Sequence, residues 1–154
     1  HLWFWDGSGV WQALPDGIAQ RHIVQKALVK LGVKINKETV KSVAEVLKTS
    51  LYVTHHEWNK KPDVINFKNG ELYYKSGHWA LEPHRRESYL TTQIPHAYDP
   101  YAQAPLFLKT LDEFFFGDPD AEDKKKLILE MIGYSLASHA AYESFIILIG
   151  EGAN

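Results

Sequence analysis

A β-rich stretch interrupted by tight-turn residues lies between two stretches of helical periodicity, and this order constrains the fold most. Val64–Phe67 is rich in residues that favour strands, Lys68–Gly70 supplies a turn, and Glu71–Tyr74 has the composition of a returning strand. The Asn-Gly pair in this turn favours the positive φ values of a two-residue hairpin. A second turn at Lys75–Gly77 leads to a third strand at His78–Leu81. The sequence therefore predicts a small antiparallel meander.

Two further segments are candidates for strands. Leu2–Trp5 is aromatic, Asp6–Gly9 can adopt positive φ, and Val10-Trp11 resumes the apolar pattern, which together predict a hairpin at the start of the chain. Leu90–Ile94, just before Pro95, is a candidate further strand of the meander.

Two helices are predicted before the meander. The first has an apolar stripe that precedes Gly32, which is placed to end the helix, and the second begins after Asn36, a plausible N-cap. The stripes consist of Val24, Ala27, Leu28 and Leu31, and then of Val40, Val43, Ala44, Leu47 and Leu51. We interpret both stripes as core packing.

Two more helices are predicted after the meander. Pro105 suits the first turn of a helix that Gly117 ends. Asp118 or Asp120 is expected to cap a second helix, which runs to about Ala137. The predicted fold class is therefore α+β.

The expected domain organisation follows from this order of elements. We expect an accessory domain over residues 1–142, with a helical part at about 15–51, a β-meander at about 64–94 and a second helical part at about 105–137. Residues 143–154 are expected to begin a further domain, so that the chain is a piece of a longer protein.

The last residues of the chain form part of a phosphate-loop pattern. Phe145–Ile149 is a continuous apolar run that suits a strand buried on both faces, and Gly150-Glu151-Gly152-Ala153-Asn154 follows it directly. A phosphate-binding loop has a strand followed by G-x-x-x-x-G-K-[ST], whose lysine and hydroxyl reach the phosphates and Mg²⁺. We expect an incomplete Walker A loop at the start of a truncated P-loop ATPase domain. The competing interpretation is a plain turn, because glycine often follows a strand.

Charge is divided unevenly along the chain. Residues 1–61 carry nine Lys and Arg against five Asp and Glu, whereas residues 62–154 carry eight against fourteen, which gives balances of +4 and −6. The whole chain is therefore not a basic nucleic-acid binder, although its first part could be one. The absence of cysteine excludes a disulfide scaffold, a thiolate zinc site and a cysteine nucleophile. No apolar run approaches the ~20 residues that span a bilayer.

Several segments occur in the order found in one known family. They are Ile65–Leu72, His84, Tyr89–Pro95, Tyr98–Pro100, Pro105–Glu113 and Phe145–Asn154. In this order they resemble the phage and plasmid primase–helicase family, in the region just before the superfamily 3 helicase ATPase domain. That region is related to one in the poxvirus primase–helicase. The resemblance is dense over about 65–154, whereas residues 1–64 match only in general style.

The resemblance implies a parent protein that unwinds DNA with ATP and Mg²⁺ during phage, prophage or plasmid replication. Such a parent is a ring-shaped hexamer in the cytoplasm of a bacterial host, often with a primase domain nearer its N-terminus, and it has no membrane partner. None of the primase's acidic motifs can be placed in this chain, and the Walker A lysine and hydroxyl are absent. The chain is thus expected to be a non-catalytic accessory domain, without a cofactor of its own, that adjoins its ATPase domain, aids oligomerisation and contacts DNA.

Basic residues supply the candidate DNA contacts. Lys37, Lys41 and Lys48 recur on one face of a predicted helix, and Arg85 and Arg86 follow His84. Any one of these lysines is more simply a solvated side chain. Aromatic residues that could stack on bases are more simply packing residues: Trp3, Phe4, Trp5, Trp11, Trp58 and Trp79. A second interpretation of the chain is a stand-alone module that binds a protein or single-stranded DNA, without an ATPase context.

Histidines and paired carboxylates do not predict a metal or catalytic site. His55 and His56 are adjacent, so they do not share a helix face and would point to opposite sides of a strand. Asp112 and Glu113 diverge in the same way on a helix, and we interpret them as surface charges.

Overall fold

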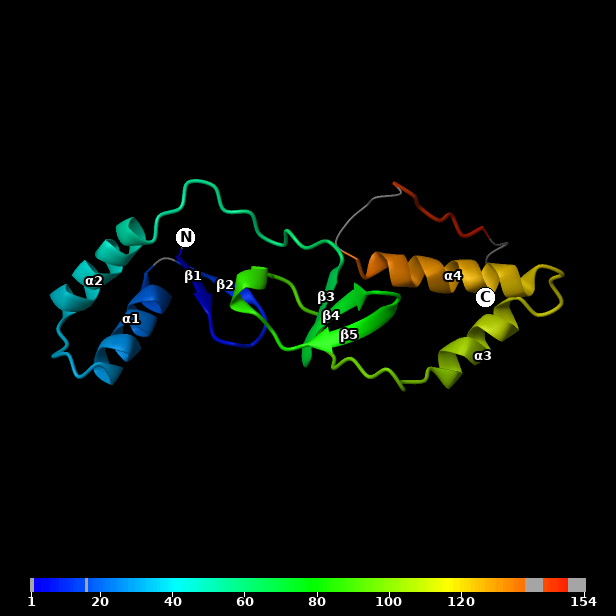
Figure 1. Ribbon diagram of the computed structural model, residues 1–154, viewed down its shortest axis with the longest axis horizontal. Helices are drawn as coiled ribbons and strands as arrows, with labels where there is room; N and C mark the ends of the chain where they lie inside the picture. Colours follow the sequence, from blue (N-terminus) through cyan, green and yellow to red (C-terminus); the bar gives the residue numbers. More distant parts are fainter. Residues whose placement is uncertain (1, 16, 138–142, 150–154) are drawn as a thin grey trace. The chain divides into compact units, whose positions relative to one another are not determined.

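The computed structural model describes residues 2–15, 17–137 and 143–149 of the chain. The fold is α+β, as predicted, and its elements are shown in Figure 1. In chain order they are β1 (Leu2–Trp5), β2 (Trp11–Leu14), α1 (Ile18–Lys30), α2 (Lys37–Ser50), β3 (Val64–Phe67), β4 (Gly70–Lys75), β5 (His78–Glu82), the short 3₁₀ helix η1 (Arg86–Ser88), α3 (Pro105–Phe114) and α4 (Ala121–Ser135).

The chain divides into two compact units. Unit 1 comprises residues 1–60 and 84–93, and unit 2 comprises residues 61–83 and 94–154. Unit 1 is therefore built from two stretches of sequence that are separated by the meander.

A hairpin and a pair of helices make up most of unit 1. β1 and β2 pair antiparallel from Leu2 with Leu14 to Trp5 with Trp11, which confirms the predicted hairpin. α1 and α2 lie side by side (Figure 1). Their shared core consists of the buried residues Val24, Leu28, Val40 and Ala44, with Ile35, Val43 and Leu47 packed against it. The predicted core packing is thus confirmed for most of both stripes, but Ala27, Leu31 and Leu51 are exposed and lie outside this core.

The predicted ends of these helices are confirmed. The side chain of Asn36 accepts a hydrogen bond of 2.7 Å from the backbone N–H of Thr39, in the first turn of α2. Gly32 follows α1 with φ of 70°, and the N–H of Val33 donates to the carbonyl of Leu28 over 3.0 Å. This pattern is a Schellman ending, in which glycine is favoured because the left-handed conformation disfavours a Cβ.

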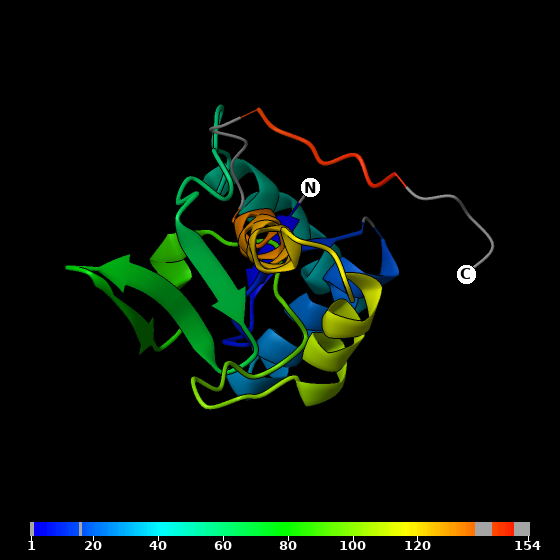
Figure 2. The same cartoon turned by 90° about the vertical axis from the view of Figure 1, so that its right-hand side faces the viewer.

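The predicted meander forms the sheet of unit 2. Its order is β3-β4-β5, both pairs are antiparallel, and the three strands lie side by side in Figures 1 and 2. Phe67 pairs with Gly70, so the first turn has two residues, Lys68 and Asn69. Gly70 already belongs to β4 with φ of 156°, and Asn69 does not have the positive φ that the Asn-Gly pair favours, so the predicted turn is present but its two residues are not the Asn-Gly pair. The second turn has positive φ at both Ser76 and Gly77, at 50° and 85°.

The predicted strand at Leu90–Ile94 is wrong, because this segment forms only one isolated bridge. Ile94 lies parallel to Phe67, and its N–H donates to the carbonyl of Asn66 over 2.8 Å. Pro95 follows and has no N–H to continue the ladder.

A side-chain clamp holds the chain beside the first turn of the meander. The amide of Asn69 donates to the carbonyl of Tyr98 over 2.9 Å and accepts from its N–H over 2.8 Å. The backbone N–H of Lys68 donates to the carbonyl of His96 over 2.9 Å. The turn residues therefore fix the path of the segment that leads to α3.

The two C-terminal helices are confirmed, but the capping of the second is not. α3 begins at Pro105, and Gly117 lies in the following turn with φ of 80°. Asp120 is the N-cap residue of α4, yet its side chain makes no capping hydrogen bond. Its carboxylate lies 2.8 Å from the Lys124 ammonium, and Asp118 also pairs with this lysine. The Asp120 carboxylate is therefore engaged in an ion pair, and the predicted cap does not form.

The predicted strand at Phe145–Ile149 is not confirmed. Residues 143–149 have no regular secondary structure, and most of their side chains are exposed, with Ile149 at 93% and Phe145 at 81%. A strand needs a neighbour for its hydrogen bonds, and no strand pairing is made by residues 143–149. The predicted Walker A residues Gly150–Asn154 lie outside the described residues.

Candidate nucleic-acid interface

The uneven charge of the sequence follows the two units. Unit 1 carries ten Lys and Arg against six Asp and Glu, a balance of +4. Unit 2 carries seven against thirteen, a balance of −6. A polyanion would therefore be attracted to unit 1 and repelled by unit 2.

The lysines of unit 2 are mostly neutralised by acids of the same unit. Five of them pair with nearby carboxylates: Lys75 with Glu82, Lys109 with Glu113, Lys124 with Asp118 and Asp120, Lys125 with Asp112 and Glu122, and Lys126 with Glu130. Hydrogen bonds to Asp118 and then to Asp120 raise the pKa of Lys124. These lysines therefore balance acidic side chains on the surface of unit 2.

The lysines of α2 are placed differently. Lys37 and Lys41 are exposed and form no ion pair with any residue in the described part of the chain, whereas Lys48 lies 3.4 Å from Glu45. At 100° per residue, the three lysines share one side of the helix, roughly 60° around from the Val40 and Ala44 side that is buried. The three lysines therefore lie on one helix face, as their spacing predicted. Two of them, Lys37 and Lys41, have no ion-pair partner among the described residues that would compete with an anion.

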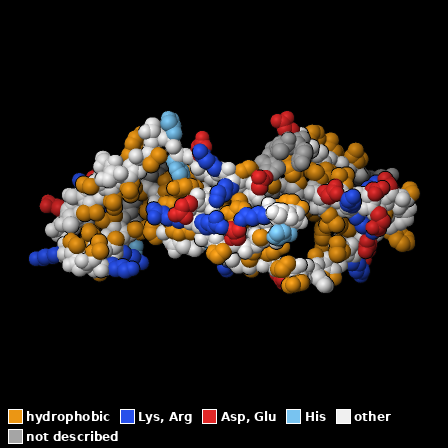
Figure 3. Space-filling model, viewed as in Figure 1, with side chains coloured by type: hydrophobic (Ala, Val, Ile, Leu, Met, Phe, Trp, Pro, Cys, Tyr) orange, Lys and Arg blue, Asp and Glu red, His pale blue; other side chains and the backbone are white. Residues whose placement is uncertain are grey.

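α1 and its following loop add more exposed cations. Arg21, Lys26, Lys30 and Lys34 are exposed, and none forms an ion pair within the described residues. In Figure 3, basic side chains project at the end of the α1–α2 pair that carries the connecting loop.

Arg85 and Arg86, the other predicted DNA contacts, lie at η1, away from the helices in sequence. Both are exposed, and the Arg86 guanidinium lies 5.4 Å from the centre of the Trp11 ring. The indole N–H of Trp11 donates to the Arg86 carbonyl over 2.9 Å, so the backbone at this arginine is fixed.

An aromatic cluster accompanies these arginines in unit 1. We define it as Trp3, Trp5, Trp11, His56, Trp58 and Tyr89. The ring centres of Trp3 and Trp58 are 4.1 Å apart, and those of Trp11 and Trp58 are 5.8 Å apart. Tyr89 stacks on Trp11 at 5.8 Å with an angle of 23° between the planes. The cluster thus joins the hairpin, the segment after α2 and the residues around η1.

The sequence interpretation found only part of this cluster. It singled out the tryptophans, and four of the five lie here, whereas Trp79 lies in unit 2 beside Tyr74 at 5.1 Å. It missed His56, which lies edge-on to Trp58 at 4.3 Å and to Tyr89 at 4.4 Å. No spacing rule joins residues from segments so far apart, so only the fold could identify the set.

A close contact fixes the hairpin loop to the second segment of unit 1. Gly9 is buried with φ of 100°, and a Cβ there would lie 2.5 Å from the His84 ring and from the Gln93 amide. The Gln93 amide donates to the Ser8 carbonyl over 2.9 Å. The His84 ring and the Gln93 side chain therefore pack against the hairpin loop.

The described residues show no metal-binding group. No three His, Asp or Glu side chains among them lie together as a potential metal site. His55 is exposed, whereas His56 belongs to the aromatic cluster. Of Asp112 and Glu113, the first pairs with Lys125 at 2.6 Å and the second with Lys109 at 3.5 Å, on the surface of unit 2.

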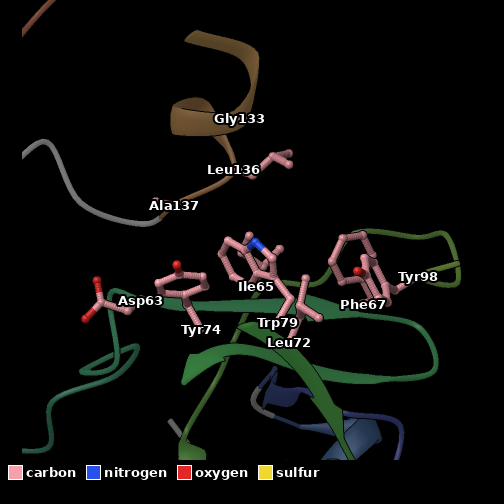
Figure 4. A pocket seen from close by; sticks show the side chains of 10 residues that line it. All are labelled: Asp63, Ile65, Phe67, Leu72, Tyr74, Trp79, Tyr98, Gly133, Leu136 and Ala137. Atoms are coloured by element: carbon pink, nitrogen blue, oxygen red, sulfur yellow. The ribbon is translucent and has the colours of Figure 1, made fainter. Parts of the chain in front are cut away.

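Unit 2 contains an apolar cavity of about 600 Å³ on its sheet face. Figure 4 shows Tyr74, Trp79 and Leu72 pointing from the strands toward Leu136, which follows α4. Asp63 is the only charged residue among those lining it. The cavity offers apolar contact but no group of polar side chains that could carry out a reaction.

None of the helices in the described ranges combines the length and apolar character needed to cross a membrane.

The chain matches the family model described as "D5 N terminal like" over residues 1–116. The match extends into residues 1–64, where the sequence resemblance was only general. No curated protein and no solved structure matches the chain. The chain therefore belongs to the D5 N terminal like family, the N-terminal region of phage and plasmid primase–helicase proteins, which confirms the resemblance inferred from its motifs.

Proposed function

We propose that this chain is a non-catalytic accessory region that precedes the ATP-dependent helicase of a primase–helicase and contacts DNA phosphates through α2. One observation carries the DNA contact: Lys37 and Lys41 are exposed and unpaired within the described part of unit 1, whereas five lysines of unit 2 are neutralised. Family membership supports the helicase context.

The physical basis is the release of counterions from DNA. Each phosphate that a lysine neutralises releases condensed cations, so log affinity falls with log salt by roughly 0.7 to 0.9 per contact. Contacts of this kind carry no sequence information. Binding by unit 1 should therefore be weak, indifferent to sequence and steeply dependent on salt.

The test compares two double charge reversals in the whole chain. Lys37→Glu with Lys41→Glu removes the unpaired cations of α2, and Lys109→Glu with Lys126→Glu makes the same change of net charge in unit 2. The control lysines form exposed pairs at 3.5 and 3.8 Å, which contribute little to stability. Fluorescence anisotropy with labelled DNA is measured at several salt concentrations.

We expect the α2 reversal to weaken binding and to lower the salt slope by about 1.4 to 1.8, and the control to retain the parental slope. Equal slopes for the two variants would refute the proposed contact. Failure of the parental chain to bind DNA at low salt would also refute the proposed contact.

ATP and Mg²⁺ belong, on this proposal, to an ATPase domain that begins with residues 143–154 and whose incomplete Walker A loop is Gly150–Asn154. The chain alone should then show no Mg-ATP binding in the micromolar range, because the Walker A lysine and hydroxyl are absent from it. Tight binding in isothermal titration calorimetry would contradict the assignment of these residues to a partial loop.

We also propose that α3 and α4 help the parent ring to oligomerise. Leu111 is the only buried residue of these two helices, while Leu106, Phe114 and Leu127 are more than half exposed. Exposed apolar side chains on two adjacent helices are typical of a surface covered in an assembly. Sedimentation velocity of the chain at increasing concentration tests this, and a monomer at all concentrations would count against it.

A further inference from the structure

We infer that the aromatic cluster of unit 1 is a stacking site for the bases of single-stranded DNA, with the Tyr89 ring as its exposed surface. This inference rests on the proposed DNA contact and deepens it, because it names the strand state that the region recognises. Its evidence comes from segments separate from α2.

The backbone presents Tyr89 in an unusual way. Ser88 and Leu90 on either side are 2% and 5% exposed, whereas Tyr89 is 37% exposed. Tyr89 has φ of 50° and ψ of 36°, the left-handed conformation that side-chain-bearing residues disfavour. Such conformations persist where the surroundings enforce them, and they concentrate at functional sites. The chain thus turns one large ring outward between two buried residues.

Asn59 holds this segment from across the unit. Its N–H donates to the Tyr89 carbonyl over 3.1 Å, and its side-chain oxygen accepts from the N–H of Thr91 over 2.8 Å. The Asn59 side-chain amide also donates to the Thr91 hydroxyl over 2.7 Å. On the other side, the N–H of Trp11 donates to the Leu90 carbonyl over 2.7 Å. The backbone that carries the Tyr89 ring is therefore held from both sides.

The rings behind Tyr89 form a continuous aromatic support. Trp11 stacks on it, and His56 lies edge-on to it at 4.4 Å. Arg86 places its guanidinium over Trp11 at 5.4 Å, and Arg85 is exposed beside it. An aromatic surface bordered by cations matches a base with its phosphate, since the ring stacks on the base and the cation attracts the backbone.

This chemistry selects single strands. In a duplex the bases stack on each other and their faces are covered, whereas a single strand can turn a base onto a protein ring. Stacking accepts every base because each has an aromatic face. The site should thus prefer single-stranded DNA to duplex without preferring a sequence.

The test uses two substitutions at Tyr89 in the whole chain. Tyr89→Phe keeps the ring, and Tyr89→Asn removes it while tolerating the left-handed backbone. Binding to an oligothymidine of about 20 nucleotides is measured by anisotropy at several salt concentrations, and circular dichroism checks that both variants are folded. We expect Tyr89→Phe to bind as the parent does, and Tyr89→Asn to bind about five-fold or more weakly, with an unchanged salt slope.

A second measurement needs no change in the cluster. Four of the five tryptophans belong to unit 1, so oligothymidine should quench the tryptophan fluorescence of the parent and of Trp79→Phe alike. Parental affinity in folded Tyr89→Asn, or quenching that disappears in Trp79→Phe, would overturn the stacking site. Loss of binding only on reversal of Lys37 and Lys41 would retain the phosphate contact and reject stacking. No DNA binding by the parent would reject both.

Discussion

Replacing Gly9 with alanine tests the packing that joins the two sequence segments of unit 1. A Cβ at Gly9 would lie 2.5 Å from the Cε1 atom of His84 and from the Nε2 atom of Gln93. Gly7 is the matched control, because its φ of 89° is close to the 100° of Gly9 but no atom lies within 4 Å of its Cβ position. The two substitutions therefore share a backbone penalty and differ in the steric clash.

The expected magnitudes follow from these two contributions. Alanine in the left-handed region costs roughly 1–2 kcal/mol at either position. Overpacking typically adds 1–3 kcal/mol. Because the His84 and Gln93 atoms are the ends of side chains that can shift, we expect Gly9→Ala to be the more destabilising by about 1–2 kcal/mol.

Urea unfolding followed by tryptophan fluorescence measures this difference, since four of the five tryptophans lie in unit 1. Free energies of unfolding for the two variants that agree within about 0.5 kcal/mol would show that the hairpin loop does not pack on His84 and Gln93.

Two further predictions concern unit 2. Asn69→Ala removes both bonds to the Tyr98 backbone and should destabilise the unit by about 1–3 kcal/mol in urea unfolding followed by circular dichroism, with Asn69→Asp less damaging because an acceptor remains. The pKa of Lys124 is raised from 10.5, chiefly by its hydrogen bond to Asp118. Its folded pKa therefore exceeds its unfolded one, and its stabilising contribution is present at neutral pH and lost as the pH rises through the folded pKa. Thermal unfolding of the parent and of Lys124→Gln should differ at pH 7, and the difference should shrink as the pH rises beyond the ordinary lysine value of 10.5; a constant difference would contradict this.

Elements whose causes are local could be predicted from the sequence. The Asn36 cap and the Gly32 helix end each depend on a residue type and its immediate backbone, and the structure confirms both. The predicted turn between β3 and β4 is also present, although Lys68 and Asn69 are its two residues. Most of the apolar stripe of α2 was also correct, because helical spacing alone brings Val40 and Ala44 together, whereas Leu51 at the end of the helix is exposed.

Features that depend on distant partners could not be predicted. The oxygen of Asp120 pairs with Lys124 instead of capping α4, and the segment up to Ile94 stops pairing after one bridge. The aromatic cluster is the largest omission, because His56 and Tyr89 meet only when residues 84–93 join unit 1. Composition identified the tryptophans but carried no information on their neighbours.

The surface charge, too, could be predicted from the sequence only in part. The sequence separated a basic from an acidic part of the chain, but it could not show which cations are neutralised. Lys125 lies 2.6 Å from Asp112, thirteen residues away, whereas Lys41 has no such partner in the described structure. The difference between a solvated face and a candidate anion site is therefore a property of the fold.

Hydrogen–deuterium exchange of the whole chain, with and without oligothymidine at low salt, tests the central claim most directly. The account predicts slower exchange in α2 and in the segment Arg85–Tyr89 when DNA is bound, with α3 and α4 unchanged. Slower exchange confined to α3 and α4, or no change anywhere at saturating DNA, would contradict the assignment of DNA binding to unit 1.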